Sequence, residues 1–258
     1  MKPSFFRSVH FYQALAVLSF CALWEAASRL HWVDSELLPP LSTSVSTLYE
    51  LMGTTDFRRH AGDTFQRIII SFVIGAPVAV AFGFFIGEKA DAGAFLKPII
   101  QFTMAVPQSV FLPIFILVFG VGDLEKIVFG VTHIFFVVAV NTVAAVASVS
   151  RGLVQAARSF GASRSQVYRK IYLPAMLPLI INGLRLGMVF NVVGILLAEM
   201  YASRTGLGVL IFRWAEANST DKLMAAIVLI SITTILFNEV MRSLEAKTGR
   251  WQRAQENQ

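Results

Sequence analysis

The side chains best suited to recognising a partner are concentrated in one segment, Ser150–Leu177. It reads SRGLVQAARSFGASRSQVYRKIYLPAML, and its charged residues are all basic. The segment interrupts a chain that is otherwise strongly apolar. Cations grouped around small residues predict non-covalent docking rather than catalysis. We therefore interpret the segment as a docking surface for another protein.

Local signals divide this segment into helix, tight turn and helix. Residues Leu153–Phe160 favour helix, and Gly161 suits the left-handed residue that follows a helix end. Ser163, with Gln166 three residues later, predicts a capping box that opens the second helix. Pro174 either ends that helix or starts the next one. The expected surface combines small, bulky and basic residues, namely Ala156, Ala157, Phe160, Tyr168, Tyr172, Arg158, Arg164, Arg169 and Lys170.

Two other interpretations of the segment are weaker. A DNA-binding helix-turn-helix has similar spacing. However, the segment is joined directly to an apolar span at each end, without linkers, so a recognition helix could not easily reach a major groove. A plain basic loop leaves Gly161, the capping box and Pro174 unexplained. We therefore expect no nucleic-acid partner.

Other chemistry finds little support along the chain. No G-x-x-x-x-G-K-[ST] stretch is present to hold nucleotide phosphates. There is no HExxH, paired acidic motif or Ser/His/Asp grouping, so an integral membrane enzyme ranks last. His133 has no second ligand nearby, which favours a buried hydrogen bond over a metal site. Cys21 is the single cysteine, so an internal disulfide is excluded. We expect no catalytic residue, metal or cofactor in this chain.

Composition places the chain in a membrane. Hydrophobic residues make up 55% and charged residues 15% of the 258 positions, and mean hydropathy is +0.64. A soluble domain has about a quarter charged residues, and a membrane helix needs about 20 apolar residues. The expected fold is an all-α integral membrane protein of about six transmembrane helices, at approximately Phe11–Ala27, Ile68–Ile86, Ile99–Phe119, Ile127–Val149, Leu177–Ala198 and Leu223–Met241.

The distribution of positive charge predicts how the spans are oriented. Lys2 and Arg7 before the first span also fit a cleaved signal peptide, but the apolar run is long and no A-x-A site closes it. With six spans and a cytoplasmic N-terminus, thirteen Lys/Arg are cytoplasmic and eight, including Arg67 and Lys126, are external. By the positive-inside rule this favours both termini, and the segment Ser150–Leu177, in the cytoplasm.

Residue spacing predicts how some spans pack. Gly75, Ala79, Gly83 and Gly87 form a small-residue stripe that lets another helix approach closely. Pro107 and Pro113 predict a bent or broken third span. Leu41, Val45, Leu48 and Leu51/Met52 recur at helical spacing, which predicts a short helix at the outer interface.

Polar residues inside spans are candidates for a translocation pathway. Gln101 and Gln108 share a face of span three, as Asn141 and Ser148 do in span four. Arg185 and Glu199 lie within about 40° of one face of span five, and we expect this face to look into the bundle or a subunit seam. A structural role for Arg185 is at least as well supported as substrate contact. The candidate pathway set is Gln101, Gln108, Asn141, Arg185 and Glu199.

The docking segment resembles the EAA loop of binding-protein-dependent ABC importer permeases. The matching positions are Gln155, Ala156, Ala157, Gly161, Ile171, Leu173 and Pro174. Gln155 replaces the usual glutamate, which puts in doubt an ion pair with the ATPase. Three further stretches, Ala105–Ile127, Arg158–Gly187 and Ala198–Ile211, resemble the nitrate/sulfonate/taurine group. The likeness covers roughly Leu38 to Leu244.

The resemblance implies a function and a set of partners. The chain would be the permease subunit of an importer in the bacterial inner membrane, paired with a second permease subunit in an expected homodimer. Two cytoplasmic ATP-binding subunits would carry the ATP and Mg²⁺, and an extracytoplasmic solute-binding protein would deliver a small, anionic solute. Ala156, Ala157 and Gly161 would sit in the ATPase groove, with Arg158, Arg164 and Arg169 around it. A gradient-driven transporter or channel remains the alternative.

The expected division of the chain follows from these assignments. Residues 1–10 form a cytoplasmic N-terminus, and residues 11–64 hold the first span and the external amphipathic segment. Residues 65–244 form the permease core, including the cytoplasmic coupling loop 150–176. Residues 245–258 form a cytoplasmic tail.

Overall fold

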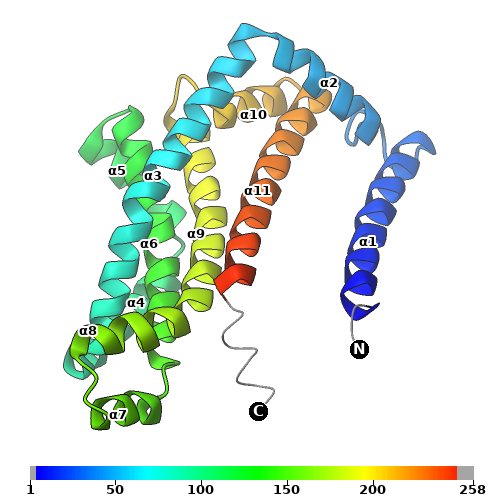
Figure 1. Ribbon diagram of the computed structural model, residues 1–258. Coiled ribbons are helices and arrows are strands. Elements are labelled where there is room, and N and C mark those ends of the chain that lie inside the picture. The colour runs from blue at the N-terminus through cyan, green and yellow to red at the C-terminus, as the bar shows by residue number, and fades with distance from the viewer. Residues whose placement is uncertain (1–3, 249–258) are drawn as a thin grey trace.

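The computed structural model describes residues 4–248, which fold into helices joined by short connections (Figure 1). No strand occurs among these residues. The elements are α1 (Ser4–Arg29), α2 (Leu41–Gly53), α3 (Thr55–Glu88), α4 (Ala90–Ala105), η1 (Gln108–Phe111), α5 (Leu112–Phe119), α6 (Asp123–Ala147), α7 (Arg151–Ser159), α8 (Arg164–Val167), η2 (Tyr168–Tyr172), α9 (Leu173–Ala202), α10 (Leu207–Glu216) and α11 (Thr220–Thr248).

Five helical segments are long and apolar enough to cross a membrane. They belong to α1, α3, α6, the continuous run from α8 through α9, and α11. Helix α4 and the η1–α5 segment pass the same test together, although an 84° bend separates them. The break lies at Val106 and Pro107, as the prolines of this span predict. The all-α membrane fold is confirmed, with five or six spans.

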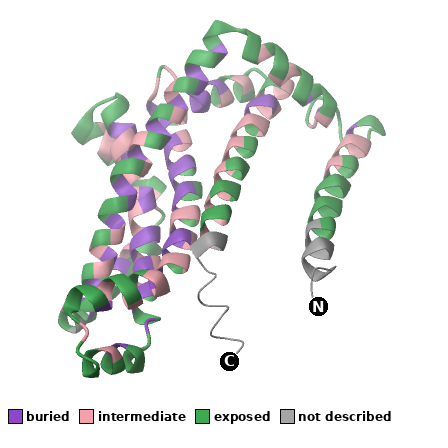
Figure 2. Cartoon of the chain, in the orientation of Figure 1, coloured by how far each residue is buried: buried purple, intermediate pink, exposed green. Residues whose placement is uncertain are grey.

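Helix α6 is the packing centre, with α3 on one side and α9 on another. A side chain at Gly75, Gly83 or Gly87 would collide with α6, where the nearest groups belong to Ile134, Ala139 and Val146. The predicted small-residue stripe of α3 is therefore confirmed as a helix contact. Helix α9 also packs on α6 through glycines. Gly183, Gly187 and Gly194 contact the side chains of Asn141, Val138 and His133, respectively. Burial is concentrated on these helices (Figure 2).

The short elements lie at the two ends of the helix bundle (Figure 1). Helices α2 and α10 lie at one end, and the predicted outer helix corresponds to α2. Leu48 and Leu51 of α2 pack against a core that includes Phe57 and Leu207. Helices α7 and α8 lie at the opposite end, where α1 begins and α11 ends.

The helix bounds differ from the expected divisions at both ends of the chain. Helix α1 begins at Ser4, within the segment expected as a cytoplasmic N-terminus. Helix α11 continues through Thr248, past the expected start of the tail. Residues 249–258 of that tail lie outside the described residues.

Candidate functional site

Helix α7 presents the predicted coupling residues on an exposed face. Ser150 caps the helix, because its hydroxyl accepts a hydrogen bond from Leu153 N. Val154 is buried and fixes the inner face. Gln155, Ala156 and Arg158 are exposed, and Ala157 is half-buried.

The turn after α7 has the geometry that its residues predict. Gly161 takes φ +79°, in the left-handed region that glycine adopts without strain. In the capping box, Ser163 N donates to Gln166 Oε1 at 2.7 Å and Gln166 N donates to Ser163 Oγ at 3.3 Å. Phe160 is 92% exposed at this turn.

The two short helices enclose a pocket of about 450 Å³ on this surface. Predicted coupling residues Ala157, Gly161 and Ile171 line it, together with Phe160, Ala162, Gln166, Val167 and Lys170. Leu173 and Pro174 lie outside it, in the first turn of α9. Arg164 points away toward α3, where its Nη2 lies 3.4 Å from Glu88 Oε1.

The second helix of the coupling segment is not a separate helix. Helix α8 continues through the π-helical η2 into α9 without a break. Pro174 therefore does not end this helix, and it lies in the first turn of the segment α9, which contains the next span. A buried cluster fixes the junction to the bundle: Val149, Val154, Val167, Met176 and Ile180 pack together, with Phe84 of α3 against them. This cluster joins α7 and α8 to α3, α6 and α9 by direct packing.

The predicted pathway residues do not converge on one site. Gln101 is exposed on α4, and Asn141 Nδ2 donates to Val137 O of its own helix at 2.8 Å. Gln108 Oε1 is buried at the break before η1, with no hydrogen-bond partner among the described residues. Arg185 and Glu199, predicted to share one stripe, bind groups on different helices.

Arg185 joins α9 to α11. Its Nε donates to Asn238 Oδ1 at 2.7 Å, and its Nη1 lies 3.1 Å from Glu245 Oε2. Of the two roles left open for Arg185, the structural one fits these contacts. The Arg185 guanidinium is therefore paired with two groups of α11.

Glu199 lies in a buried polar network at the end of the bundle opposite α7. Its carboxylate is fully buried and accepts from Arg67 Nη1 at 2.6 Å, Thr64 Oγ1 at 2.8 Å and Gly208 N at 2.9 Å. Gly206 approaches so closely, at φ +121°, that a β-carbon there would collide with this carboxylate. The network joins α3, α9 and α10. These hydrogen bonds hold the three helices together.

Arg67 extends the network to α6. Its Nη2 lies 2.7 Å from Asp123 Oδ1, and its Nη1 donates to Thr205 O at 2.8 Å. Lys126 forms a second buried set beside it, in which Nζ donates to Ala202 O at 2.7 Å and to Glu125 Oε2 at 3.2 Å. Burying a charged group costs much less when it is paired and hydrogen-bonded. Glu125 is only partly satisfied, because its Oε1 is buried with no hydrogen-bond partner among the described residues.

Arg67 and Lys126 correct the sequence-based charge assignment. Both were counted as external loop charges, but they are only 5% and 1% exposed. Lys126 lies in the first turn of α6 and Arg67 in the first half of α3. Both stand beside the expected start of an apolar span, so the sequence alone could not distinguish a water-facing cation from one paired inside the bundle. Their partners, Glu199 and Ala202, are more than seventy residues away.

His133 forms the predicted buried hydrogen bond, since its Nδ1 lies 3.0 Å from Phe129 O. Within residues 4–248 no three His, Cys, Asp or Glu side chains group closely enough to hold a metal ion.

Comparison with known proteins agrees with this architecture. Residues 73–250 match the family described as binding-protein-dependent transport system inner membrane component. Because this match covers more than half of the sequence, the chain belongs to that family of ABC transporter permeases.

Two relatives share most of their length with the chain. The taurine transport system permease protein TauC of Escherichia coli K12 is 30% identical, over 92% of this chain and 87% of the relative. The putative aliphatic sulfonates transport permease protein SsuC of Bacillus subtilis 168 is 29% identical, over 91% and 85%.

A solved structure has the same fold. A chain of the MetNI methionine ABC transporter, in inward-facing conformations, superposes with a TM-score of 0.58 at 22% identity. The match covers 82% of this chain and 99% of that one. At this level of identity the likeness establishes the fold alone.

Proposed function

We propose that this permease lines the translocation pathway of an ATP-driven importer and is driven by a cytoplasmic ATP-binding subunit docked on α7 and α8. The observation that carries the proposal is the exposed surface of Gln155, Ala156 and Phe160, held on a buried cluster at one end of the spans. No phosphate-binding loop occurs in the sequence. The ATP and Mg²⁺ therefore belong to the partner.

A second copy of the chain is the proposed permease partner. Helix α1 stands apart from the other spans (Figure 1), with almost every described side chain exposed or half-buried. Helix α9 also has an exposed apolar face, at Leu186, Val189 and Val193. These surfaces support a homodimer with a shared pathway between the copies.

The proposed solute is taurine or another alkanesulfonate, delivered by an extracytoplasmic solute-binding protein. The support is the likeness to the TauC and SsuC permeases. The paired Arg185 and Glu199 are not proposed as its ligands. Solute choice is expected to rest largely with the binding protein.

The proposed location is the bacterial inner membrane, with both termini on the cytoplasmic side. The start of α1, the end of α11 and the coupling helices all lie at one end of the bundle (Figure 1). The excess of basic residues assigned to this side supports the orientation.

The test is to co-express the chain with its candidate ATP-binding subunit and reconstitute the purified complex in liposomes with the binding protein. Copurification, and taurine uptake that requires ATP and is blocked by vanadate, are expected. Uptake by the chain alone, driven by an ion gradient, would replace the proposal with a secondary transporter. ATP-dependent uptake of a different solute would retain the permease and change only its substrate.

A further inference from the structure

The far end of α3 carries a carboxylate that its own helix disfavours. Glu88 is the last residue of this 34-residue helix, and no basic residue lies in its last turn. The carbonyl end of a helix carries partial negative charge, so a carboxylate there is repelled. Its position therefore depends on groups from outside α3.

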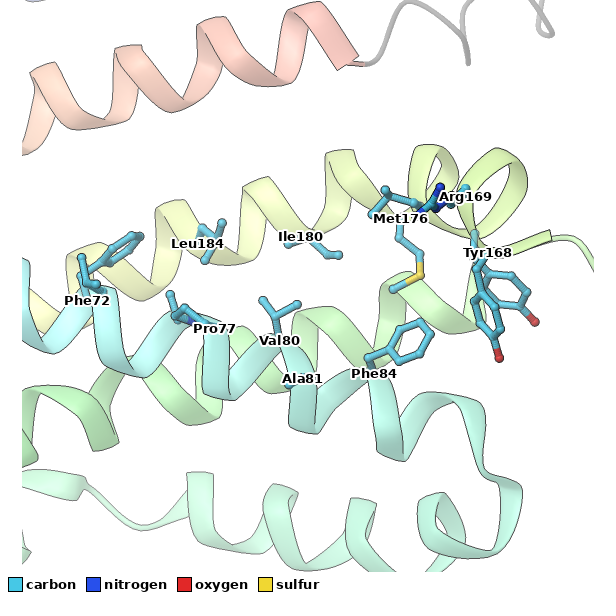
Figure 3. Close-up of a pocket in the computed structure, with 14 residues that line it drawn as sticks. Phe72, Pro77, Val80, Ala81, Phe84, Tyr168, Arg169, Met176, Ile180 and Leu184 are labelled. Atoms are coloured by element: carbon cyan, nitrogen blue, oxygen red, sulfur yellow. The ribbon is translucent and has the colours of Figure 1, made fainter. Parts of the chain in front are cut away.

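Those groups come from α8 and η2. The Tyr168 hydroxyl donates to Glu88 Oε1, and Arg164 approaches the same oxygen at 3.4 Å. The Tyr168 ring lies 5.9 Å from the Phe84 ring and 5.7 Å from the Arg164 guanidinium. Phe84 and Tyr168 meet at one end of an apolar groove between α3 and α9, of about 790 Å³ (Figure 3).

The two contacts on Glu88 are not equivalent. The Arg164 side chain is 79% exposed, and exposed ion pairs contribute little because water screens them. Tyr168 is half-buried, and its bond to a carboxylate is charge-assisted. The hydroxyl of Tyr168 is thus the principal partner of Glu88.

Tyr168 lies where the coupling helices meet two spans, because it belongs to the segment that leads into α9 and also contacts α3. It is the first residue of η2, the π-helical segment that fuses α8 to α9. Such segments are frequent at functional sites. Helix α9 must follow α8 because the chain between them is continuous helix. Helix α3 has no such link, since Glu88 is 80 residues away from Tyr168 in sequence.

We propose that Glu88 and Tyr168 are positioning residues that fasten the end of α3 to α8, so that this end of α3 follows α8 and α9 when the coupling helices are pushed. The source of the push rests on the proposed function. The fastening itself is a property of this chain and is present without nucleotide.

The test measures a distance between two spin labels, one on each side of the contact. Cys21 is replaced by alanine, and cysteines are introduced by Val78→Cys on α3 and Ser165→Cys on α8, both at exposed positions. Distances are recorded on the purified full-length chain, and then on its complex with the ATP-binding subunit, before and after trapping with ATP and vanadate. A single narrow distance, unchanged by trapping, is expected.

Two tyrosine variants give a matched comparison. Tyr168→Phe removes the hydroxyl bound to Glu88 and keeps the ring. Tyr172→Phe makes the same change four residues later in η2, where the hydroxyl forms no hydrogen bond within the described part of the chain. In Tyr168→Phe a second, longer distance should appear, because losing a bond to a charged group shifts the ratio of fastened to released forms by roughly tenfold or more.

Further outcomes decide the proposal. The distance distribution of Glu88→Ala should match that of Tyr168→Phe. The distribution of the double variant should be no broader than that of either single variant. Tyr172→Phe should match the parent. A narrow, unchanged distance in Tyr168→Phe, or a distance in the parent that changes on trapping, would overturn the fastening. If no ATP-binding subunit is captured, the proposed function fails, while the nucleotide-free comparison of the two tyrosine variants still decides the contact.

Discussion

At the scale of single residues, buried polar groups do more to organise this permease than the exposed basic ones. Glu199 contacts α3 through Arg67 and Thr64, and α10 through Gly208 N. These hydrogen bonds compensate the loss of water around a fully buried carboxylate. One side chain therefore fixes the relative positions of three helices.

Removing this carboxylate's charge should destabilise the protein. Glu199→Gln leaves Arg67 buried beside a neutral group, and breaking a buried pair in this way costs about 3–5 kcal/mol. Thermal unfolding of the purified protein in detergent measures the effect. Glu239→Gln, which changes an exposed pair with Arg242, is the control and should unfold like the parent. Equal unfolding of the two variants would contradict the role given to Glu199.

Gly161 illustrates a residue whose position is set by backbone conformation rather than by space. A β-carbon there would meet nothing within 4 Å, while φ is +79°. Asn and Asp tolerate this left-handed conformation better than other side chains do. The two residues are close in size and differ in charge.

Substitutions at Gly161 should therefore separate folding from docking. Gly161→Asp is expected to reach the membrane but to lose capture of the ATP-binding subunit and transport, because it places a negative charge on the docking surface. Gly161→Asn should fold equally well and should lose less of the capture of the ATP-binding subunit and less of the transport. Membrane abundance and copurification are measured together. Full uptake by Gly161→Asp would rule out docking at this turn.

At the scale of elements, the bundle is assembled by close approach of glycines to α6. The stripe on α3 is visible in the sequence because its four members are each four residues apart. The glycines of α9 are less regular, and only the structure shows that Gly183, Gly187 and Gly194 all contact α6. Helix packing in lipid relies on such close contacts because apolar burial alone gives little preference for protein over lipid.

Adding one methyl group at two positions of α3 should have opposite effects. At Gly83, a β-carbon would lie 2.5 Å from Ala139 O, so Gly83→Ala should destabilise by about 1–3 kcal/mol. At Gly62 nothing lies within 4 Å, so Gly62→Ala should stabilise by about 0.5–1 kcal/mol through the reduced freedom of the unfolded chain. Unfolding midpoints of both variants test this. A shift of the same sign at both positions would contradict the packing of α3 on α6.

At the scale of the whole molecule, α7 and α8 lie at one end of the bundle and α2 and α10 at the other (Figure 1). Phe160 marks one end and Tyr49 the other, and both are largely exposed. Six crossings, counting the broken α4–α5 segment as one, return the chain to the side on which it started.

Labelling with a membrane-impermeant thiol reagent tests this orientation. In a Cys21→Ala background, Phe160→Cys should react only after the cells are opened, whereas Tyr49→Cys should react in intact cells with a permeable outer envelope. The excess of basic residues on the side of Phe160 is the physical reason. The reverse pattern would place the coupling helices outside and remove the proposed ATP-driven mechanism.

The sequence alone determined those features that depend on local rules. Apolar length predicts the spans, φ preference and capping chemistry predict the turn at Gly161 and the box at Ser163 and Gln166, and proline predicts the break at Pro107. Each needs only a few neighbouring residues, so the pattern is complete within one stretch of sequence.

Only the tertiary structure decided which polar residues are paired. Arg67 and Glu199 lie 132 positions apart, and nothing near either one in sequence marks the other as its partner. The same applies to Glu88 and Tyr168, and to Arg185 with Asn238. A buried charge acquires its role from the groups that replace its water, and those groups are brought together by packing of distant helices.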